Sequence, residues 1–133
     1  MTNYHLCARD MMQTEVATVW PDVTVRDAAA LMRHNGVRSL IVEKETPDDA
    51  YGIITYADIV NKVLAYGFDP AEVHVAEIMT KPLIEVNPAL KAEMVARLFA
   101  NNNIGHAPVM EGDKLVGVIS MTDLITEVIT EPE

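Results

Sequence analysis

Two short stretches of this sequence place a hydroxyl and a carboxylate three residues apart, directly after an apolar run. They are Thr55-Tyr56-Ala57-Asp58 and Ser120-Met121-Thr122-Asp123. At the start of a helix, the hydroxyl and the first-turn amides form a site for an anion, and the carboxylate accepts hydrogen bonds from a ligand. The same spacing is a variant of the capping box, in which both groups bond to the helix's own N–H groups and no ligand is needed. The two roles are compatible with each other.

The two stretches are parts of an internal repeat. Pro21 aligns with Pro88 at an offset of 67 residues (88 − 21), and after a slip of two residues Gly52 aligns with Gly117 at 65 (117 − 52). A unit of this length holds several secondary elements, and two copies predict a closed, pseudo-twofold pair instead of an open solenoid. We assign residues 1–66 to the first repeat and residues 67–133 to a linker and the second repeat, with both repeats in one compact unit.

Composition restricts the class of protein. The chain has 133 residues and is 50% hydrophobic, and a domain near this size buries roughly two thirds of its unfolded surface. A formal net charge of −10 opposes attraction to phosphate, so we expect no nucleic-acid partner and no membrane partner. The first ten residues are too polar for a secretory signal, and a single cysteine fits a reducing compartment. We therefore expect a cytoplasmic protein.

Each repeat is predicted to run strand, helix, strand, strand, helix. The first strands cover residues 17–19 and 84–86. Thr24 begins the first helix as part of a capping box, whereas Lys91 stands at the corresponding place in the second repeat,. There we expect Asn87 to cap the helix, with Pro88 in its first position.

The remaining elements follow in the same order in both repeats. Gly36 and Asn103 are predicted to end the first helices, because both residue types tolerate the left-handed backbone of a helix end. The expected hairpin strands and final helices cover residues 39–42, 51–54 and 56–65, then 107–110, 115–119 and 121–129. The second hairpin turn, residues 111–113, is tight, and the longer loop at residues 45–50 accounts for the slip in register.

The pattern resembles the CBS domain, a module named after cystathionine beta-synthase that occurs as tandem pairs. The resemblance rests on Met12 and Met79, on Val19-Trp20-Pro21 and Val86-Asn87-Pro88, on Ala29-Ala30-Leu31-Met32, on Gly36-Val37 with Leu40-Ile41-Val42, on Ala107-Pro108-Val109, and on both Gly-x-x-Thr/Ser-x-x-Asp stretches. It implies a mixed α/β (α+β) fold, a disc-like pair of repeats with helices outside two small sheets. It also implies two clefts that bind adenosine-containing ligands in a regulatory sensor.

The resemblance assigns roles to particular residues. Asp58 and Asp123 would bind ribose. The phosphate groups would lie against Thr55, Ser120, Arg38 and His106, and the adenine against Val16, Ala17, Leu83 and Ile84. Arginine is a permanent cation, whereas histidine contributes charge only when protonated. The alternatives are that Arg38 and His106 are solvated strand ends and that the adenine segments are simply core strands.

No catalytic set or metal site is recognisable. The sequence has no nucleophile elbow, no Walker loop and no paired carboxylates, so we expect no enzyme. His5, Cys7, His34 and His74 are too few and too scattered for a structural zinc site,.

Our main hypothesis is a regulatory module that binds AMP or ATP, requires no cofactor, and signals to an unknown effector protein in trans. The alternatives are a structural or dimerisation module with degenerate sites, and a binder of S-adenosylmethionine or NAD(H). Arg38 favours a phosphate-bearing ligand over S-adenosylmethionine. We also expect a homodimer that forms through the final helices, with Ile59, Val63, Leu124 and Val128 as apolar contact positions.

Overall fold

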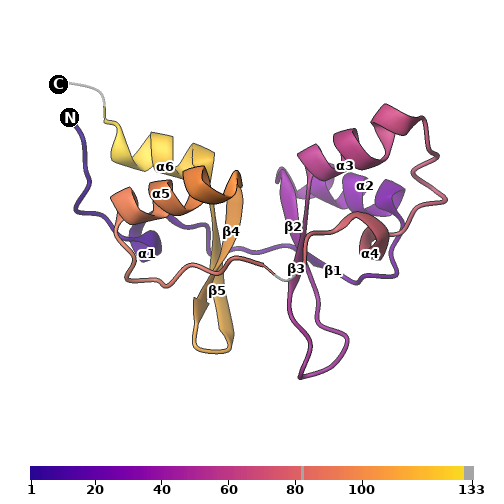
Figure 1. The fold of residues 1–133 in the computed structure, drawn as a ribbon, viewed down its shortest axis with the longest axis horizontal. Helices are drawn as coiled ribbons and strands as arrows, with labels where there is room; N and C mark the ends of the chain where they lie inside the picture. The colour runs from indigo at the N-terminus through magenta and orange to yellow at the C-terminus, as the bar shows by residue number, and fades with distance from the viewer. Residues whose placement is uncertain (82, 131–133) are drawn as a thin grey trace. The chain divides into compact units, whose positions relative to one another are not determined.

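The computed structural model describes residues 1–81 and 83–130. They form two compact units (Figure 1): unit 1 comprises Met1–Glu15 with Ile84–Glu133, and unit 2 comprises Val16–Leu83. Each unit therefore combines the helices and hairpin of one repeat with the short segment that precedes the first strand of the other repeat.

Unit 2 is built on a three-stranded sheet in the order β1-β2-β3. Strand β1 runs parallel to β2, and β2 runs antiparallel to β3 with Ser39 opposite Thr55. Its elements are β1 (Thr18–Val19), α2 (Val25–Asn35), β2 (Ser39–Val42), β3 (Gly52–Thr55), α3 (Tyr56–Lys62), the 3₁₀ turn η1 (Leu64–Tyr66) and α4 (Val75–Ile78).

Unit 1 is built on the antiparallel hairpin of β4 and β5, in which His106 lies opposite Ser120. The strand predicted at residues 84–86 is reduced to one parallel bridge, between Val86 and Val109. The elements are α1 (Ala8–Met11), α5 (Ala92–Asn102), β4 (His106–Glu111), β5 (Lys114–Ser120) and α6 (Met121–Val128). Helices α5 and α6 lie side by side along the hairpin (Figure 1).

In each unit, the segment that precedes the first strand of the other repeat provides a hydrogen-bond acceptor for the start of a helix, α5 in unit 1 and α2 in unit 2. The Ala92 N–H donates to the Leu6 carbonyl at 2.8 Å, and the Val25 N–H donates to the Val73 carbonyl at 2.8 Å. These bonds satisfy N–H groups that a helix start leaves without an internal partner. The prediction of an Asn87 cap is wrong, because α5 begins only after Lys91.

Several local signals are confirmed. Thr24 Oγ1 accepts from the Asp27 N–H at 3.2 Å, so it caps α2. Gly36 and Asn103 end α2 and α5 with left-handed φ angles of 64° and 51°. Helix α3 is shorter than predicted, since the chain tightens into η1 after Lys62.

Three of the four side chains predicted to form dimer contacts are buried in the cores of their own units. Val63, Ile59 and Val128 are only 0%, 7% and 8% exposed. The first two belong to the core of unit 2 and the third to that of unit 1, against which Leu124 also packs. Ile59, Val63 and Val128 hold the final helices onto their own units and are not free for a second chain, whereas Leu124 is only half-buried. The prediction was wrong because helical periodicity alone does not separate the inner apolar face from an outer one.

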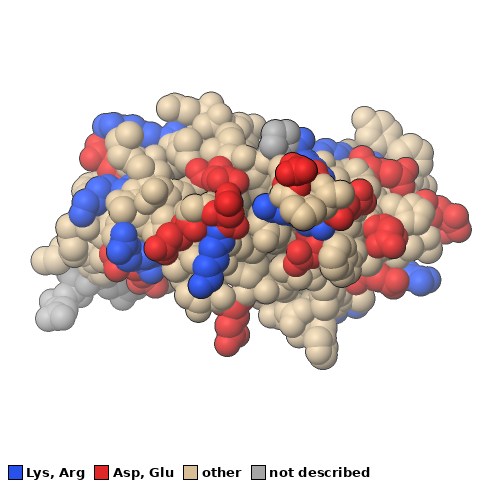
Figure 2. Space-filling view, turned by 90° about the horizontal axis from the view of Figure 1, so that it is seen from below, with Lys and Arg blue, Asp and Glu red and all other residues tan. Residues whose placement is uncertain are grey.

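Acidic and basic side chains are intermingled over the face shown in Figure 2. Among residues 1–81 and 83–130, no helix is both long and apolar enough to cross a membrane. The same residues contain no cluster of three or more His, Cys, Asp or Glu side chains that could hold a metal ion.

Candidate functional site

In unit 2, Thr55 and Asp58 form a hydroxyl–acid pair that caps the start of α3. Thr55 Oγ1 accepts from the Asp58 N–H at 3.2 Å, while Asp58 Oδ2 accepts from the Thr55 N–H at 2.9 Å and from its hydroxyl at 3.1 Å. The chain reaches this point in extended conformation from β3 and turns directly into the helix. The capping-box interpretation is therefore confirmed here.

The pair of unit 1 repeats this geometry at the start of α6. Asp123 Oδ2 accepts from the Ser120 N–H at 2.9 Å and from its hydroxyl at 3.0 Å, and Ser120 Oγ accepts from the Asp123 N–H at 3.2 Å. In both units one carboxylate oxygen is thus committed to the helix start. A ligand hydroxyl would have to bond to the other oxygen, Oδ1.

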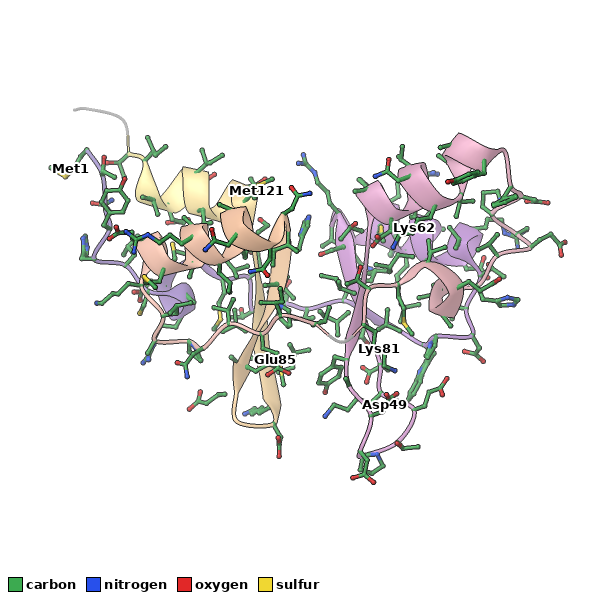
Figure 3. All side chains as sticks on the ribbon, in the orientation of Figure 1. Met1, Asp49, Lys62, Lys81, Glu85 and Met121 are labelled. Carbon is green, nitrogen blue, oxygen red and sulfur yellow. The ribbon has the colours of Figure 1, made fainter. Side chains whose placement is uncertain are left out.

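The two Oδ1 atoms have different neighbours. Asp58 Oδ1 lies 3.0 Å from Lys62 Nζ, and this ammonium also donates to the Ile78 carbonyl at 2.8 Å. Lys62 is labelled on α3 in Figure 3. In unit 1, Asp123 Oδ1 instead accepts from Gln13 Nε2 at 3.0 Å. A carboxylate oxygen has two acceptor positions, so each Oδ1 retains room for one further donor.

Sequence reasoning missed both neighbours. Lys62 could have been found, since it stands four residues after Asp58, where opposite charges on a helix meet. Gln13 lies 110 positions from Asp123, and no local pattern connects the two.

The first-turn amides of these helices are largely used within the protein. The Tyr56 N–H donates to the Arg38 carbonyl at 3.2 Å, and the Met121 N–H donates to the Gly105 carbonyl at 2.9 Å. Since the third amide of each helix bonds to the capping hydroxyl, little of the expected amide anion site remains.

These same bonds identify Gly105 as the structural counterpart of Arg38. His106, the first residue of β4, corresponds in turn to Ser39 of β2. Arg38 and His106 therefore occupy neighbouring and not equivalent positions, whose side chains point to opposite faces along an extended chain. Their phosphate-binding roles stay predictions.

In unit 2 the segment predicted to contact adenine lies at the same end of the sheet as the capping pair. Val16 and Ala17 precede β1 and are half-buried, and the Ala17 carbonyl accepts from the Ile41 N–H at 3.1 Å. Strands β1 and β2 start at the end of the sheet where β3 finishes. Val16 and Ala17 therefore lie at the same end of the sheet as Arg38 and Thr55.

Unit 1 has a comparable arrangement at one end of its hairpin. Ile84 precedes Val86, whose parallel bridge to Val109 brings the segment alongside β4. Because the bridge is parallel, Ile84 lies toward the start of β4, where His106 is paired with Ser120. Leu83 and Ile84 are half-buried, and Leu83 is the last residue of unit 2. The ribose, phosphate and adenine assignments stay predictions.

Comparisons with known proteins agree on one family. The CBS domain family matches residues 8–65 and again residues 75–130. The structure of a hexameric CBS-CP12 protein from bloom-forming cyanobacteria superposes with a TM-score of 0.90 at 46% identity, covering 92% of this chain and 68% of that one. The CBS domain-containing protein YhcV of Bacillus subtilis is 33% identical over 87% of this chain and 81% of its own length.

Part of an enzyme also matches. The arabinose 5-phosphate isomerase KdsD of Yersinia pestis is 30% identical over 84% of this chain but only 34% of its own length. The two family matches along the sequence and the similarity to CBS proteins over most of the chain show that it belongs to the CBS domain family, as a tandem pair of CBS domains.

Proposed function

We propose that this tandem CBS pair is a regulatory module that binds an adenine nucleotide, AMP or ATP, and passes its occupancy to a partner protein. One observation carries the proposal. In each unit, a capping hydroxyl–acid pair, a basic residue and a half-buried apolar segment lie at the same end of the sheet. These are the kinds of group that phosphate, ribose and adenine require. The capping pair and the apolar segment recur at equivalent places, whereas the basic residues Arg38 and His106 stand one position apart.

The ribose hydroxyls would donate to the Oδ1 atoms of Asp58 and Asp123, beside Lys62 and Gln13 respectively. Arg38 and His106 would contact the phosphate groups. The Thr55 and Ser120 hydroxyls would join them by turning their O–H groups from Asp58 and Asp123 toward a phosphate oxygen,. Val16, Ala17, Leu83 and Ile84 would contact the adenine. Occupancy changes the behaviour of a partner only as far as the ligand binds the two states with different affinity.

Arg38 supports a phosphate-bearing ligand. It is exposed and forms no ion pair among the described residues. A guanidinium free of carboxylates matches phosphate geometry in two parallel hydrogen bonds. S-adenosylmethionine carries no phosphate and would not use this group, whereas NAD(H) would.

We also propose that the chain forms a homodimer. Both final helices expose apolar side chains, and the CBS-CP12 protein that is 46% identical to this chain is hexameric. An assembly of two chains would give nucleotide occupancy an association equilibrium to shift.

The test is a thermal-shift panel of AMP, ADP, ATP, NAD(H), S-adenosylmethionine and, as a matched control, cytidine monophosphate. One site held at about 100 times its dissociation constant stabilises the folded state by roughly 2.7 kcal/mol. We expect AMP or ATP to raise the melting temperature and cytidine monophosphate to leave it unchanged. A melting temperature that no adenosine compound changes would favour a purely structural module.

A further inference from the structure

The position four residues after the capping acid carries opposite charges in the two units. In unit 2 it is Lys62, whose Nζ lies 3.0 Å from Asp58 Oδ1. In unit 1 it is Glu127, at the 65-residue offset of the repeat (127 − 62 = 65). Residues four apart are neighbours on a helix surface. The acid of unit 2 therefore has a cation beside it, whereas Asp123 of unit 1 has a second, exposed acid on the same side of its helix.

A different element supplies the neighbour of Asp123. Gln13 and Thr80 correspond at the 67-residue offset (80 − 13 = 67), and each bridges to the hairpin of its own unit, Gln13 to Val118 and Thr80 to Ile53. The Gln13 amide donates to Asp123 Oδ1 at 3.0 Å, in the place that a lysine ammonium fills in unit 2. An amide has no net charge, so this contact leaves the negative charge of Asp123 uncompensated.

The residue before the second strand extends this contrast. Arg38 is exposed there in unit 2, whereas Gly105 stands at that position in unit 1. Gly105 and Met121 border a cavity of about 430 Å³ between α5 and α6, and the described residues that line it are all uncharged. The basic residue assigned to phosphate in unit 1 is His106, which is cationic only when protonated. The unit 2 site thus combines one acid with two cations, and the unit 1 site combines two acids with one titratable base.

We propose that Lys62 and Glu127 set the ligand charge that each site accepts, so that the unit 2 site prefers ATP and the unit 1 site prefers a ligand of low charge, adenosine or AMP. The inference rests on the nucleotide binding proposed above and adds which site takes which ligand. Two unit charges about 8 Å apart in water change an equilibrium constant about twofold, and physiological salt screens exposed charges beyond roughly that distance. Because the charges of ATP act together, ATP should distinguish the two sites about tenfold more strongly than uncharged adenosine does.

Lys62 also has a structural contact, which must be separated from the effect of its charge. Its ammonium donates to the Ile78 carbonyl at 2.8 Å and so joins α3 to the end of α4. If Lys62 acted only through this bond, replacing it would change the affinities for adenosine and ATP alike. If it acts through its charge, the replacement changes the affinity for ATP much more than the affinity for adenosine.

Titrations followed by methyl NMR measure the two sites separately. Ile54 and Ile119 directly precede Thr55 and Ser120 and are both fully buried, so their δ1-methyl signals report occupancy in unit 2 and in unit 1 respectively. The probes are adenosine, AMP and ATP. We expect ATP to shift the Ile54 signal at a concentration about tenfold lower than the Ile119 signal, and adenosine to show a much smaller difference.

Charge variants then test the two residues. Lys62→Gln should lower the ATP affinity of the unit 2 site roughly fivefold and leave its adenosine affinity within about twofold, whereas Lys62→Arg should retain the preference for ATP. Glu127→Gln should raise the ATP affinity of the unit 1 site roughly twofold. The matched control is Lys114→Gln, which makes the same change in net charge at the far end of the β4–β5 hairpin from Ser120 and should leave the preferences of both sites unchanged.

Each other outcome has a separate meaning. An equal preference for ATP at both signals, or a stronger one at Ile119, would overturn this inference while nucleotide binding itself would stand. An equal loss of adenosine and ATP affinity in Lys62→Gln would show that the lysine acts only through its bond to the Ile78 carbonyl, which also overturns its role in selecting ligand charge. If none of the three probes shifts either signal, the proposed nucleotide binding fails and this inference fails with it.

Discussion

Gln13 Nε2 donates to Asp123 Oδ1 at 3.0 Å, although the two residues come from opposite ends of the chain. The equivalent oxygen of Asp58 lies 3.0 Å from the Lys62 ammonium. A ribose hydroxyl would therefore share its acceptor with a neutral amide in unit 1 and with a cation in unit 2. The two candidate sites repeat the same capping box and differ in the group beside it.

Asp58→Ala and Asp123→Ala separate capping from ligand binding. Loss of a cap lowers the free energy of unfolding by about 1 kcal/mol. Loss of a ribose contact weakens nucleotide binding by about 1.5–3 kcal/mol, the range for a hydrogen bond to a charged group. We expect both losses, measured by urea unfolding and by calorimetric titration of AMP and ATP.

Thr24→Ala is the matched control for those variants, since Thr24 caps α2 through the Asp27 N–H at 3.2 Å and is assigned no ligand. It should lower stability by a similar amount and leave affinity unchanged. Wild-type nucleotide affinity in both aspartate variants would mean that the two acids are caps only.

Arg38→Ala should weaken binding in proportion to ligand charge. A guanidinium directed at phosphate gains more from ATP and AMP than from adenosine, and the contact should weaken with salt because Arg38 is exposed,. Titrations at low and high ionic strength measure both effects. Arg33→Ala, which removes the same charge five residues earlier, is the control and should leave the order of affinities unchanged. An equal loss for adenosine and ATP would contradict a phosphate role for Arg38.

His106→Ala tests the other site through pH. An imidazole attracts phosphate only when it is protonated, and an ordinary histidine titrates near pH 6 to 7. Wild type should therefore prefer AMP over adenosine more strongly at pH 6 than at pH 8, and the variant should lose this difference. If calorimetry gives the same preference at both pH values in both proteins, His106 does not contact phosphate.

The repeat, the helix ends and the hairpins could be predicted from sequence because each depends on local chemistry. Glycine and asparagine mark left-handed helix ends, and alternating or continuous apolar runs mark strands. The capping boxes at Thr55 and Ser120 were predictable for the same reason, since four consecutive residues contain the whole interaction.

The packing of residues 1–15 against the second repeat could not be predicted, because it depends on contacts between distant parts of the chain. Neither α1 nor α4 was expected, and the start of α5 uses the Leu6 carbonyl in place of a local cap. The correspondence of Arg38 with Gly105, by contrast, follows from the 67-residue offset of the repeat (105 − 38 = 67), and the strand register agrees with it. The core role of Ile59 and Val63 needed the packing of α3, since an apolar residue on a helix does not reveal which of two apolar faces is buried.

Gly117→Ala should destabilise unit 1 more than Gly52→Ala destabilises unit 2. A Cβ at Gly117 would lie 2.6 Å from Met12 Sδ and 2.8 Å from the Gln13 carbonyl oxygen. That carbonyl accepts from the Val118 N–H at 3.0 Å and so resists displacement. At Gly52 the corresponding distances are 2.9 Å to Met79 Sδ and 3.3 Å to the Thr80 carbonyl oxygen.

Overpacking of this kind costs about 1–3 kcal/mol, and we place Gly117→Ala at the upper end of the range in urea unfolding. Gly105→Ala is the control, because its new methyl group would meet only the flexible Met121 side chain, at 3.3 Å. An equal loss in Gly52→Ala and Gly117→Ala would mean that the Gln13 backbone yields as easily as a methionine side chain.

Asp49 should make stability depend on pH in the acid range. Lys81 Nζ donates to Asp49 Oδ2 at 2.6 Å (Figure 3), and the Glu45 and Ala50 N–H groups donate to the same carboxylate at 3.1 and 2.9 Å. The Lys81 bond, followed by these two backbone bonds, lowers the pKa of Asp49 to about 2. An unfolded aspartate titrates near pH 3.9, so unfolding takes up a proton between these two values.

The contribution of Asp49 is therefore complete above about pH 4 and is lost as the pH falls toward about 2. We expect Asp49→Asn to be less stable than wild type at pH 6 and to approach it at pH 2.5, in urea unfolding series at matched ionic strength. Asp48→Asn is the control, because Asp48 is exposed and forms no ion pair among the described residues; its stability should follow wild type across the range. A constant difference between Asp49→Asn and wild type at every pH would show that the folded and unfolded states titrate this carboxylate alike, and that the Lys81 bond does not hold it ionised.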